Sequence, residues 1–392
     1  MASKRILALD ILRGITIAGM ILVNNPGSWG HIYAPLKHAE WNGLTPTDLV
    51  FPFFMFIMGI STYISLRKYN FQFSTPAILK IIKRTILIFL IGMAIGWFSR
   101  FCYYWPSAPE DLSFGEKLWN ASWTFDRMRI LGVMQRLALC YCVTSLVAMT
   151  MKHKHIIYLI ITLLVGYFVL LMVGNGYEYN ETNILSVVDR AILTPAHMYK
   201  DNGIDPEGLL STIPAIAHVL LGFCVGRMIL GDKDNEKLTR KEVLDKHIIK
   251  FFLVGTTLTF IGCLLSYGCP LNKKIWSPTF VLVTCGLGSS LLGLLVWIID
   301  VKGYKRWSLF FESFGVNPLF MYVLGGVLSI LFGTIQLPWG EGSISIHTLI
   351  YAKTLLPLLG NTAASLAYAI IFVVINWCIG YQLYKRKIYI KL

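Results

Sequence analysis

Residues 48–66 read DLVFPFFMFIMGISTYISL, a run in which Asp48 is the only charged residue. A stretch of about 19 predominantly apolar residues is long enough to cross the hydrocarbon core of a bilayer as a helix. Comparable runs recur on both sides of it, near residues 6–25, 78–98, 129–149, 156–174, 209–229, 248–267, 277–299, 307–332 and 362–384. The sequence therefore predicts an all-α integral membrane protein, a bundle of about ten transmembrane helices.

The composition supports the bilayer as the main solvent. Apolar residues make up 55% of the chain, charged residues 14%, and the mean hydropathy is +0.61. These values lie outside the range of a soluble globular domain. Because no long polar stretch separates the apolar runs, we expect one transmembrane domain over residues 1–392. Residues 345–360 are apolar but too short to cross, so we expect an interfacial or re-entrant piece there.

The net charge of +14 is explained by topology. Lys and Arg flank the apolar runs and do not cluster with interleaved aromatics, which argues against a nucleic-acid partner. One set of loops carries more than twice as many Lys and Arg as the other set, so the positive-inside rule predicts that both termini are cytoplasmic. The longer connections, near 26–47, 99–128, 175–208 and 333–361, are then expected on the outer side.

The eight cysteines fall mostly inside apolar segments. They form no CxxC pair and no Cys/His spacing typical of zinc, so the sequence predicts packing roles for them and no metal site.

Several charged residues lie inside the apolar runs. Asp10 and Arg13 are three residues apart and close enough to pair on one helix face, and Arg129 and Arg136 recur in RMRILGVMQR. A charge at bilayer depth costs about 2.5–3.5 kcal/mol, so its presence implies a partner or a polar path. Two interpretations stay open, a structural ion pair that locks the bundle and a set of arginines that meets an anionic cofactor.

The run near 307–332 contains FESFGVNPLFMY, where Gly315 and the Asn317-Pro318 step should break the helix and free backbone polar groups. Such breaks commonly line binding sites, although a simple kink fits this pattern equally well.

Glycines four residues apart in two other runs predict close helix packing, Gly92 with Gly96 and Gly222 with Gly226. His218, in the second of these runs, is expected to be a core residue with its hydrogen bonds satisfied.

The loop that enters the run at 48–66 concentrates polar side chains. In YAPLKHAEWNGLTPTDLVFPFFMFIMG, residues 33–59, a histidine, His38, stands ten positions before Asp48. A near-neutral imidazole can take a proton from an amine or hydroxyl that attacks a carbonyl, and an asparagine amide can donate to the developing oxyanion. Thr47 and Asp48 also offer a helix cap. A capped loop with an aromatic interface anchor is the alternative.

The stretch KHAEWNGLTPTDLVFPFFMFIMG, preceded by LDILRGITIAGMILVNNPG, resembles the opening motif of the heparan-α-glucosaminide N-acetyltransferase family and its bacterial relatives. Further matching stretches are RILGVMQRLALCY, DPEGLLSTIPAI, LNKKIWSPTFVL and FFESFGVNPLFMY. They follow one another in order over nearly the whole chain.

The resemblance implies an acetyl-CoA-dependent N-acetyltransferase that takes acetyl from cytosolic acetyl-CoA and delivers it to a glucosamine amine across the membrane. The family's active-site histidine falls on His38, which would act as general base or as transient acetyl carrier. The family's asparagine falls on Asn24, with Asn25 as a second candidate. No metal is implied, and a homodimer would fit the family.

The resemblance also suggests where the two substrates bind. Four cations are candidates for the phosphates of CoA: Lys83, Arg84, Arg129 and Arg136. Three residues around His38 are expected to shape the acceptor pocket: Trp41, Asn42 and Asp48.

The sequence departs from the animal members of the family in two respects. It shows no large luminal N-terminal domain, and the link between Asn24 and His38 is longer by a few residues. For a bacterial inner (plasma) membrane protein, we expect glucosamine or another cell-envelope amino sugar as acceptor. A protein of another functional class, an amino-sugar transporter, is the alternative interpretation, and a non-catalytic scaffold subunit is a third.

Overall fold

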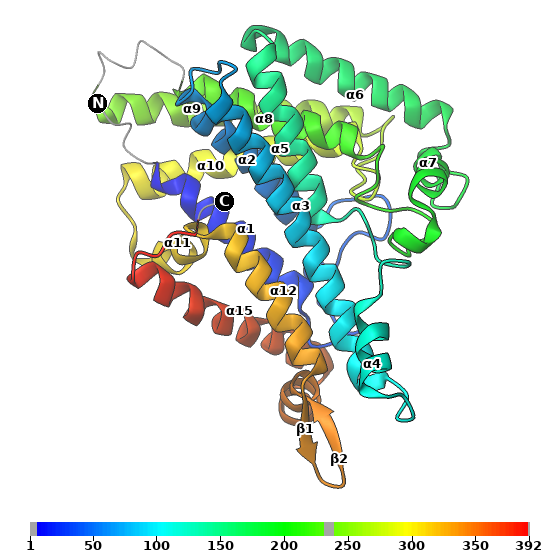
Figure 1. Cartoon of the computed structure of the whole chain (residues 1–392). Helices are drawn as coiled ribbons and strands as arrows, with labels where there is room; N and C mark the ends of the chain where they lie inside the picture. The colour runs from blue at the N-terminus through cyan, green and yellow to red at the C-terminus, as the bar shows by residue number, and fades with distance from the viewer. Residues whose placement is uncertain (1–5, 231–238, 391–392) are drawn as a thin grey trace.

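The computed structural model describes residues 6–230 and 239–390, which are mostly helical and are joined by several long loops (Figure 1). The long helices are α1 (Leu7–Asn24), α2 (Pro46–Arg67), α3 (Thr75–Tyr104), α5 (Val133–Thr150), α6 (Ile156–Val173), α8 (Thr212–Leu230), α9 (Arg240–Leu265), α10 (Pro278–Leu295), α12 (Pro318–Thr334) and α15 (Asn361–Lys385). The short ones are α4 (Phe114–Ser122), α7 (Ile184–Leu193), α11 (Leu309–Gly315), α13 (Ile346–Thr348) and α14 (Leu356–Leu359). One antiparallel hairpin joins β1 (Gln336–Trp339) to β2 (Gly342–Ser345).

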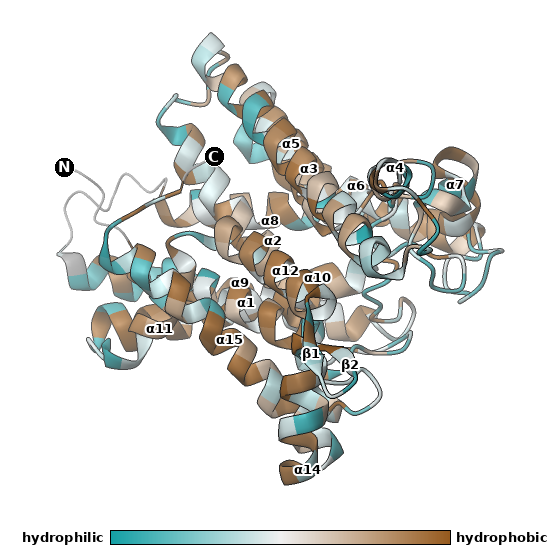
Figure 2. Cartoon of the chain, turned by 60° about the horizontal axis from the view of Figure 1, so that its bottom comes forward, coloured by the Kyte–Doolittle hydropathy of each residue, from teal (hydrophilic) through white to brown (hydrophobic). Residues whose placement is uncertain are grey.

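The predicted all-α membrane architecture is confirmed. Eight helices of the described ranges are long and apolar enough to cross a bilayer, and the bent pair of α11 and α12 adds a ninth if it is counted as one span. Each of the ten apolar runs coincides with a long helix, and hydrophobic residues dominate α12 and α15 in Figure 2. The number of crossings and the side on which the termini lie stay predictions.

The predicted break near Gly315 is present. Helices α11 and α12 meet at an angle of 79°, because Pro318 has no N–H to continue the hydrogen-bond ladder. The Asn317 side chain closes the break: its Nδ2 donates to the Ile388 carbonyl at 2.8 Å, and its Oδ1 accepts from the Ile390 N–H at 2.8 Å. The segment after α15 therefore covers the bend, and α12 is free to turn toward the cavities described below.

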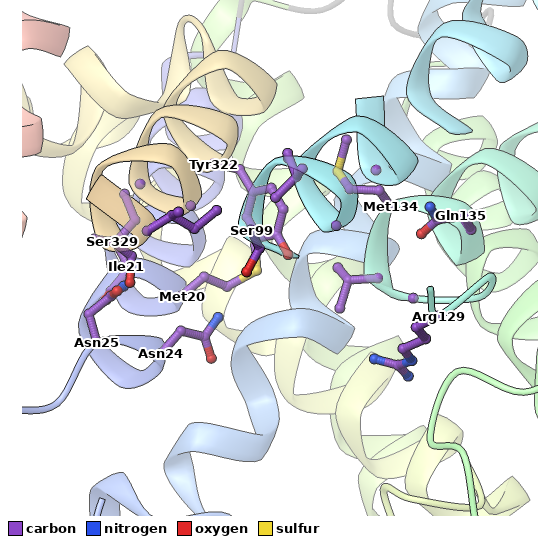
Figure 3. A pocket seen from close by; sticks show the side chains of 18 of the residues that line it. Met20, Ile21, Asn24, Asn25, Ser99, Arg129, Met134, Gln135, Tyr322 and Ser329 are labelled. Carbon is purple, nitrogen blue, oxygen red and sulfur yellow. The ribbon is translucent and has the colours of Figure 1, made fainter. Parts of the chain in front are cut away.

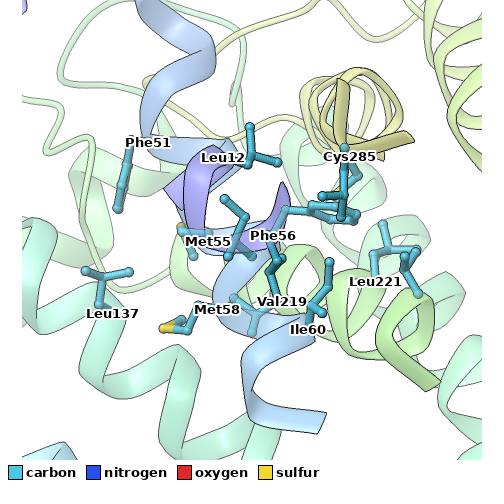
Figure 4. Close-up of a cluster of buried hydrophobic side chains, with 14 of the residues drawn as sticks. Leu12, Phe51, Met55, Phe56, Met58, Ile60, Leu137, Val219, Leu221 and Cys285 are labelled. Carbon is cyan, nitrogen blue, oxygen red and sulfur yellow. The ribbon is translucent and has the colours of Figure 1, made fainter. Parts of the chain in front are cut away.

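The core is centred on α2, where apolar side chains from α1, α5, α8 and α10 meet (Figure 4). Helix α8 approaches α2 closely at Gly222, where an added Cβ would lie 2.1 Å from the Phe56 carbonyl oxygen. Gly59 of α2 is equally close to α8, since its Cβ would lie 2.1 Å from the Val219 oxygen. The close packing predicted at Gly222 is thus confirmed.

Of two predictions about polar residues within helices, one is confirmed and the other holds in part. The Asp10–Arg13 pair forms at 3.1 Å, and Arg13 also donates to Ser61 Oγ at 2.9 Å, so this pair ties α1 to α2. Both residues line a cavity of about 560 Å³, so a ligand role for them stays a prediction. His218 is fully buried with its Nε2 2.9 Å from the Pro52 carbonyl oxygen, but its Nδ1 has no hydrogen-bond partner among the described residues.

The connections expected on the outer side gather away from the chain ends. Figure 1 shows α7 at the right, α4 at the lower right and the β1–β2 hairpin at the bottom, whereas the start of α1 and the end of α15 lie at the left. The apolar stretch Ile346–Leu359 is a short helical piece, too short to cross, as predicted. In the described residues all eight cysteines are free, and no group of three or more potential metal ligands occurs.

Candidate active site

The first turn of α2 fixes the position of Asp48. Thr45 is the N-cap residue and forms a capping box with Asp48, whose Oδ2 accepts from the Thr45 N–H at 3.1 Å and the Thr45 hydroxyl at 2.9 Å. The Ala39 N–H donates to the same oxygen at 3.1 Å. The cap predicted at Thr47 and Asp48 is corrected in one respect: the N-cap is Thr45, because the helix begins at Pro46, and the Thr47 hydroxyl instead donates to the Pro35 carbonyl.

Because Oδ2 is fully engaged, the other oxygen of Asp48 is left to His38. Oδ1 lies 2.6 Å from His38 Nδ1, and the Asp48 side chain is only 1% exposed while that of His38 is 43% exposed. A carboxylate can only accept, so this contact requires the proton on Nδ1 and leaves the lone pair on Nε2. The carboxylate thus orients the imidazole as a base.

A lysine far along the chain completes the cluster. Lys273 Nζ lies 3.0 Å from His38 Nδ1 and 3.4 Å from Asp48 Oδ1. Burial lowers the pKa of Lys273, and the nearby carboxylate of Asp48 partly opposes that shift. Three titratable groups from two loops and one helix start therefore share one small volume.

The cluster opens into a cavity of about 520 Å³ between the ends of α1, α2 and α5, the loop before α8 and the loop before α10. A second cavity of about 390 Å³ continues from it between α3 and α12. Five residues line both cavities: Met20, Asn24, Arg129, Val133 and Tyr322. Figure 3 shows the second cavity, with Asn24 of α1 and Arg129 of the segment before α5 on different sides of it.

Most charges on the wall of the first cavity are paired. Arg129 donates to Asp205 and, at 2.6 Å, to Glu207. Lys274 pairs with Asp201 at 2.8 Å and donates to the Tyr179 hydroxyl at 2.6 Å; although burial opposes its charge, these contacts raise the pKa of Lys274.

Two charged side chains that line this cavity, Glu40 and Lys200, have no ionic partner among the described residues. The wall therefore offers one free carboxylate and one free ammonium to a ligand.

The predicted catalytic residues come together. Asn24 lines the same cavity as His38 and Asp48, and within the described ranges its amide makes no hydrogen bond, so it can serve a ligand. Asn25 lines only the second cavity of the two, and its amide donates back to the Ile21 carbonyl at 2.7 Å. The geometry favours Asn24 over Asn25.

Of the three predicted acceptor-binding residues, only Asp48 is among the residues that line the cavity. Trp41 and Asn42 instead contact residues that hold the His38 loop in place. Trp41 stacks on Tyr179 with ring centroids 4.5 Å apart, and its Nε1 donates to the Tyr177 carbonyl at 2.8 Å. Asn42 accepts from Asn272 Nδ2 at 3.1 Å. Both fix the loop that carries His38.

The four predicted phosphate-binding cations occupy different surroundings. Arg129 lines both cavities, Lys83 is exposed on α3, and the Arg84 guanidinium lies 4.6 Å from the ring centroid of Tyr141. Arg136 is 1% exposed, with its guanidinium 5.1 Å from the ring of Trp276. That burial argues against a phosphate role for Arg136.

Lys273, Lys274 and Glu207 were not singled out from sequence, although they lie in stretches that carry the resemblance, LNKKIWSPTFVL and DPEGLLSTIPAI. The signal was present as motif similarity, but no spacing rule connects position 273 to position 38.

A family model described as heparan-alpha-glucosaminide N-acetyltransferase, catalytic, matches residues 5–261, well over half of the chain. The chain belongs to this family. The matched region includes Asn24, His38, Asp48 and Arg129, while Lys273 lies beyond it.

Two relatives carry the name heparan-alpha-glucosaminide N-acetyltransferase. The mouse protein is 26% identical over 444 aligned residues, which cover 100% of this chain and 61% of the relative. The human protein is 27% identical over 373 residues, which cover 81% of this chain and 52% of the relative. The chain thus spans less than two thirds of the length of these relatives.

Proposed function

We propose that this protein is a membrane acetyltransferase that moves acetyl from cytosolic acetyl-CoA to the amine of glucosamine or a related amino sugar on the outer side of a bacterial inner membrane. The observation that carries the proposal is the His38–Asp48 pair, 2.6 Å apart, at the wall of a cavity that also holds Asn24. Membership of the N-acetyltransferase family supports it.

The residues account for each proton and bond of the reaction. The neutral amine attacks the acetyl carbonyl carbon, an N–C bond forms, the C–S bond to CoA breaks, and His38 Nε2 takes the amine proton and passes it to the CoA thiolate. Asn24 donates its amide hydrogen to the oxyanion. In a two-step version the acetyl group passes first to Nε2, so both schemes use the same atom.

Acetyl-CoA is a polyanion, and the cavity wall offers cations to it. Lys200 has no ionic partner among the described residues, so it suits a phosphate group. Arg129 stands where the two cavities join, and a phosphate there would compete with its two carboxylate partners, Asp205 and Glu207. The acceptor would enter beside Glu40, whose free carboxylate suits an ammonium group. Lys83 and Arg84, on α3, would meet the part of CoA nearest the cytoplasm.

The transporter alternative predicts a different outcome in one experiment. In sealed vesicles of native orientation, radiolabelled acetyl-CoA inside should acetylate amino sugars supplied only outside, and CoA should stay inside. A panel of amino sugars identifies the acceptor. Detergent should preserve acetylation, because the chemistry needs no gradient. If the vesicles take up unmodified sugar at a rate that does not depend on acetyl-CoA, and no acceptor in the panel is acetylated, the protein is a transporter and the proposed enzyme activity is rejected.

The orientation of the vesicles requires its own measurement. An impermeant thiol reagent applied outside should label a Lys37→Cys variant and spare a Lys241→Cys variant, each in a background with its accessible cysteines replaced. The reverse pattern would place His38 on the cytoplasmic side and contradict the proposed direction of transfer.

A further inference from the structure

The Nδ1 atom of His38 has two neighbours with opposite requirements. Asp48 Oδ1, at 2.6 Å, can only accept a hydrogen bond and needs a proton on Nδ1. The Lys273 ammonium, at 3.0 Å, can only donate and needs a bare Nδ1. Since one ring nitrogen satisfies one neighbour at a time, the position of the imidazole proton depends on both.

Lys273 is held in place by a tightly bonded loop, residues 272–277. The Asn272 N–H donates to Ser277 Oγ at 3.0 Å, and the Asn272 side-chain oxygen accepts from the Ile275 N–H at 3.1 Å. The Tyr167 hydroxyl, from α6, donates to the Ile275 carbonyl at 2.7 Å. The loop is therefore fixed both internally and to a neighbouring helix.

The same loop contains a strained residue. Trp276 has a φ of 52°, in the left-handed region that bulky residues rarely adopt. It is 1% exposed, and the guanidinium of Arg136 lies over its ring at 5.1 Å. Backbone strain of this kind persists only where surrounding packing enforces it, and it is often found at functional sites. Lys273, which contacts His38, lies three residues before the strained Trp276.

We propose that Lys273 is a positioning residue that keeps His38 in its neutral form at the start of each cycle, while Asp48 holds the remaining proton on Nδ1 and so leaves Nε2 bare. A positive charge on the imidazole would stand about 3 Å from the Lys273 ammonium, and like charges at that distance repel strongly in a partly buried site. The imidazolium formed when the amine loses its proton is therefore short-lived, and the proton moves on to the CoA thiolate. This inference rests on the proposed acetyl transfer.

The other charged groups around His38 determine how removal of Lys273 should change the stability of the imidazolium. Asp48 favours the imidazolium, so it acts against Lys273. The remaining charged groups that line the cavity are Glu40, Arg129, Lys200, Asp201, Glu207 and Lys274. Arg129 pairs with two carboxylates, Asp205 and Glu207, and Lys274 pairs with Asp201, so neither cation adds net positive charge, while Glu40 and Lys200 are of opposite sign. Without Lys273, the influence of Asp48 is unopposed and the imidazolium becomes more stable.

The test uses the full-length protein and three variants, Lys273→Met, Lys273→Arg and Lys274→Met. With glucosamine as acceptor, the acidic limb of the kcat/KM profile of Lys273→Met should move to higher pH by about one unit, a tenfold loss on that limb. Near pH 9 its rate should return to within about threefold of the unmodified protein. In Lys273→Arg the acidic limb should stay at its original pH, because the positive charge is kept. In Lys274→Met the acidic limb should also stay at its original pH, even if the rate of the variant is lower.

A second readout works without acetyl transfer. Diethyl pyrocarbonate modifies only unprotonated imidazole, so its reaction with His38, followed by mass spectrometry, reports the neutral fraction against pH. Lys273→Met should show the same displacement in this assay. If wild-type and Lys273→Met profiles coincide in both assays, the role of Lys273 is rejected. If the modification profile shifts but no acetylation is found, the role of Lys273 survives and the proposed function fails.

Discussion

Two polar centres lie toward opposite ends of α2, and they differ in how their hydrogen bonds are satisfied. Near Ser61, Arg13 donates to Asp10, to Ser61 and to the Gly315 carbonyl, so each of these three contacts joins a donor to an acceptor. Near Asp48, the Nδ1 of His38 meets both a carboxylate and an ammonium. The first arrangement has one stable state, whereas the second has two. The candidate site is therefore distinguished by one atom with two incompatible hydrogen-bond partners, more than by the presence of buried charge.

The largest effect is expected at His38. His38→Ala removes the base, so we expect acetylation to fall by about 10² to 10⁴-fold. Since the side chain is 43% exposed, the melting temperature should hardly change. Turnover by the purified, folded variant, measured with radiolabelled acetyl-CoA, checks this. A variant that acetylates at near-normal rate would remove His38 from the mechanism.

The next effect is expected at Asp48. Asp48→Asn keeps an oxygen for the helix cap but loses the negative charge that holds the proton on Nδ1, so we expect acetylation to fall by about 10- to 1,000-fold. Asp10→Asn is the matched control, because it makes the same chemical change at the centre to which the proposed reaction assigns no role. Equal losses in the two variants would contradict the distinction between the centres.

Breaking the other centre should affect stability instead. Arg13→Met removes the guanidinium that lies 3.1 Å from Asp10 and its hydrogen bond to Ser61, so we expect a loss of about 1.5–3 kcal/mol in the free energy of unfolding. Titration with SDS in mixed micelles measures it. The folded variant should acetylate within a few-fold of normal, and Lys83→Met, an exposed lysine on α3, should leave stability within about 0.5 kcal/mol.

The smallest effect is expected where α2 and α8 touch. Gly222→Ala places a Cβ 2.1 Å from the Phe56 carbonyl oxygen, so the helices must separate, and we expect a loss of about 1–3 kcal/mol by the same titration. Gly166→Ala is the control, because nothing lies within 4 Å of its added Cβ. Equal stability of the two variants would show that the helix contact is softer than the structure indicates.

Local patterns predicted the elements that depend on local rules. The apolar runs gave the helices, the Gly315 and Asn317-Pro318 steps gave the 79° bend, and the three-residue spacing gave the Asp10–Arg13 pair. In each case the partners lie within a few residues, so spacing determines geometry. The His38–Asp48 contact is also local, across a capped loop of ten residues, but the pair itself was not predicted, because the sequence suggested a helix cap and an acceptor contact for Asp48.

The lysine of the cluster could not be predicted in this way. Lys273 meets His38 across 235 residues, and only the packing of the loop before α10 decides that contact. The arginines of RMRILGVMQR show the same limit. Arg129 lines the cavities and Arg136 is buried against Trp276, yet nothing in their sequence surroundings distinguishes them.

The bend between α11 and α12 has a consequence for how the protein is made. Asn317 is closed by Ile388 and Ile390, which are 71 and 73 residues further along. During synthesis these residues have not yet left the ribosome when α12 enters the membrane, so the bend can be sealed only after residues 388–390 emerge. A premature stop codon at position 388 would remove both contacts and leave the Asn317 amide without these two partners. A purification tag should therefore be placed after Ile390 and should not replace residues 388–390.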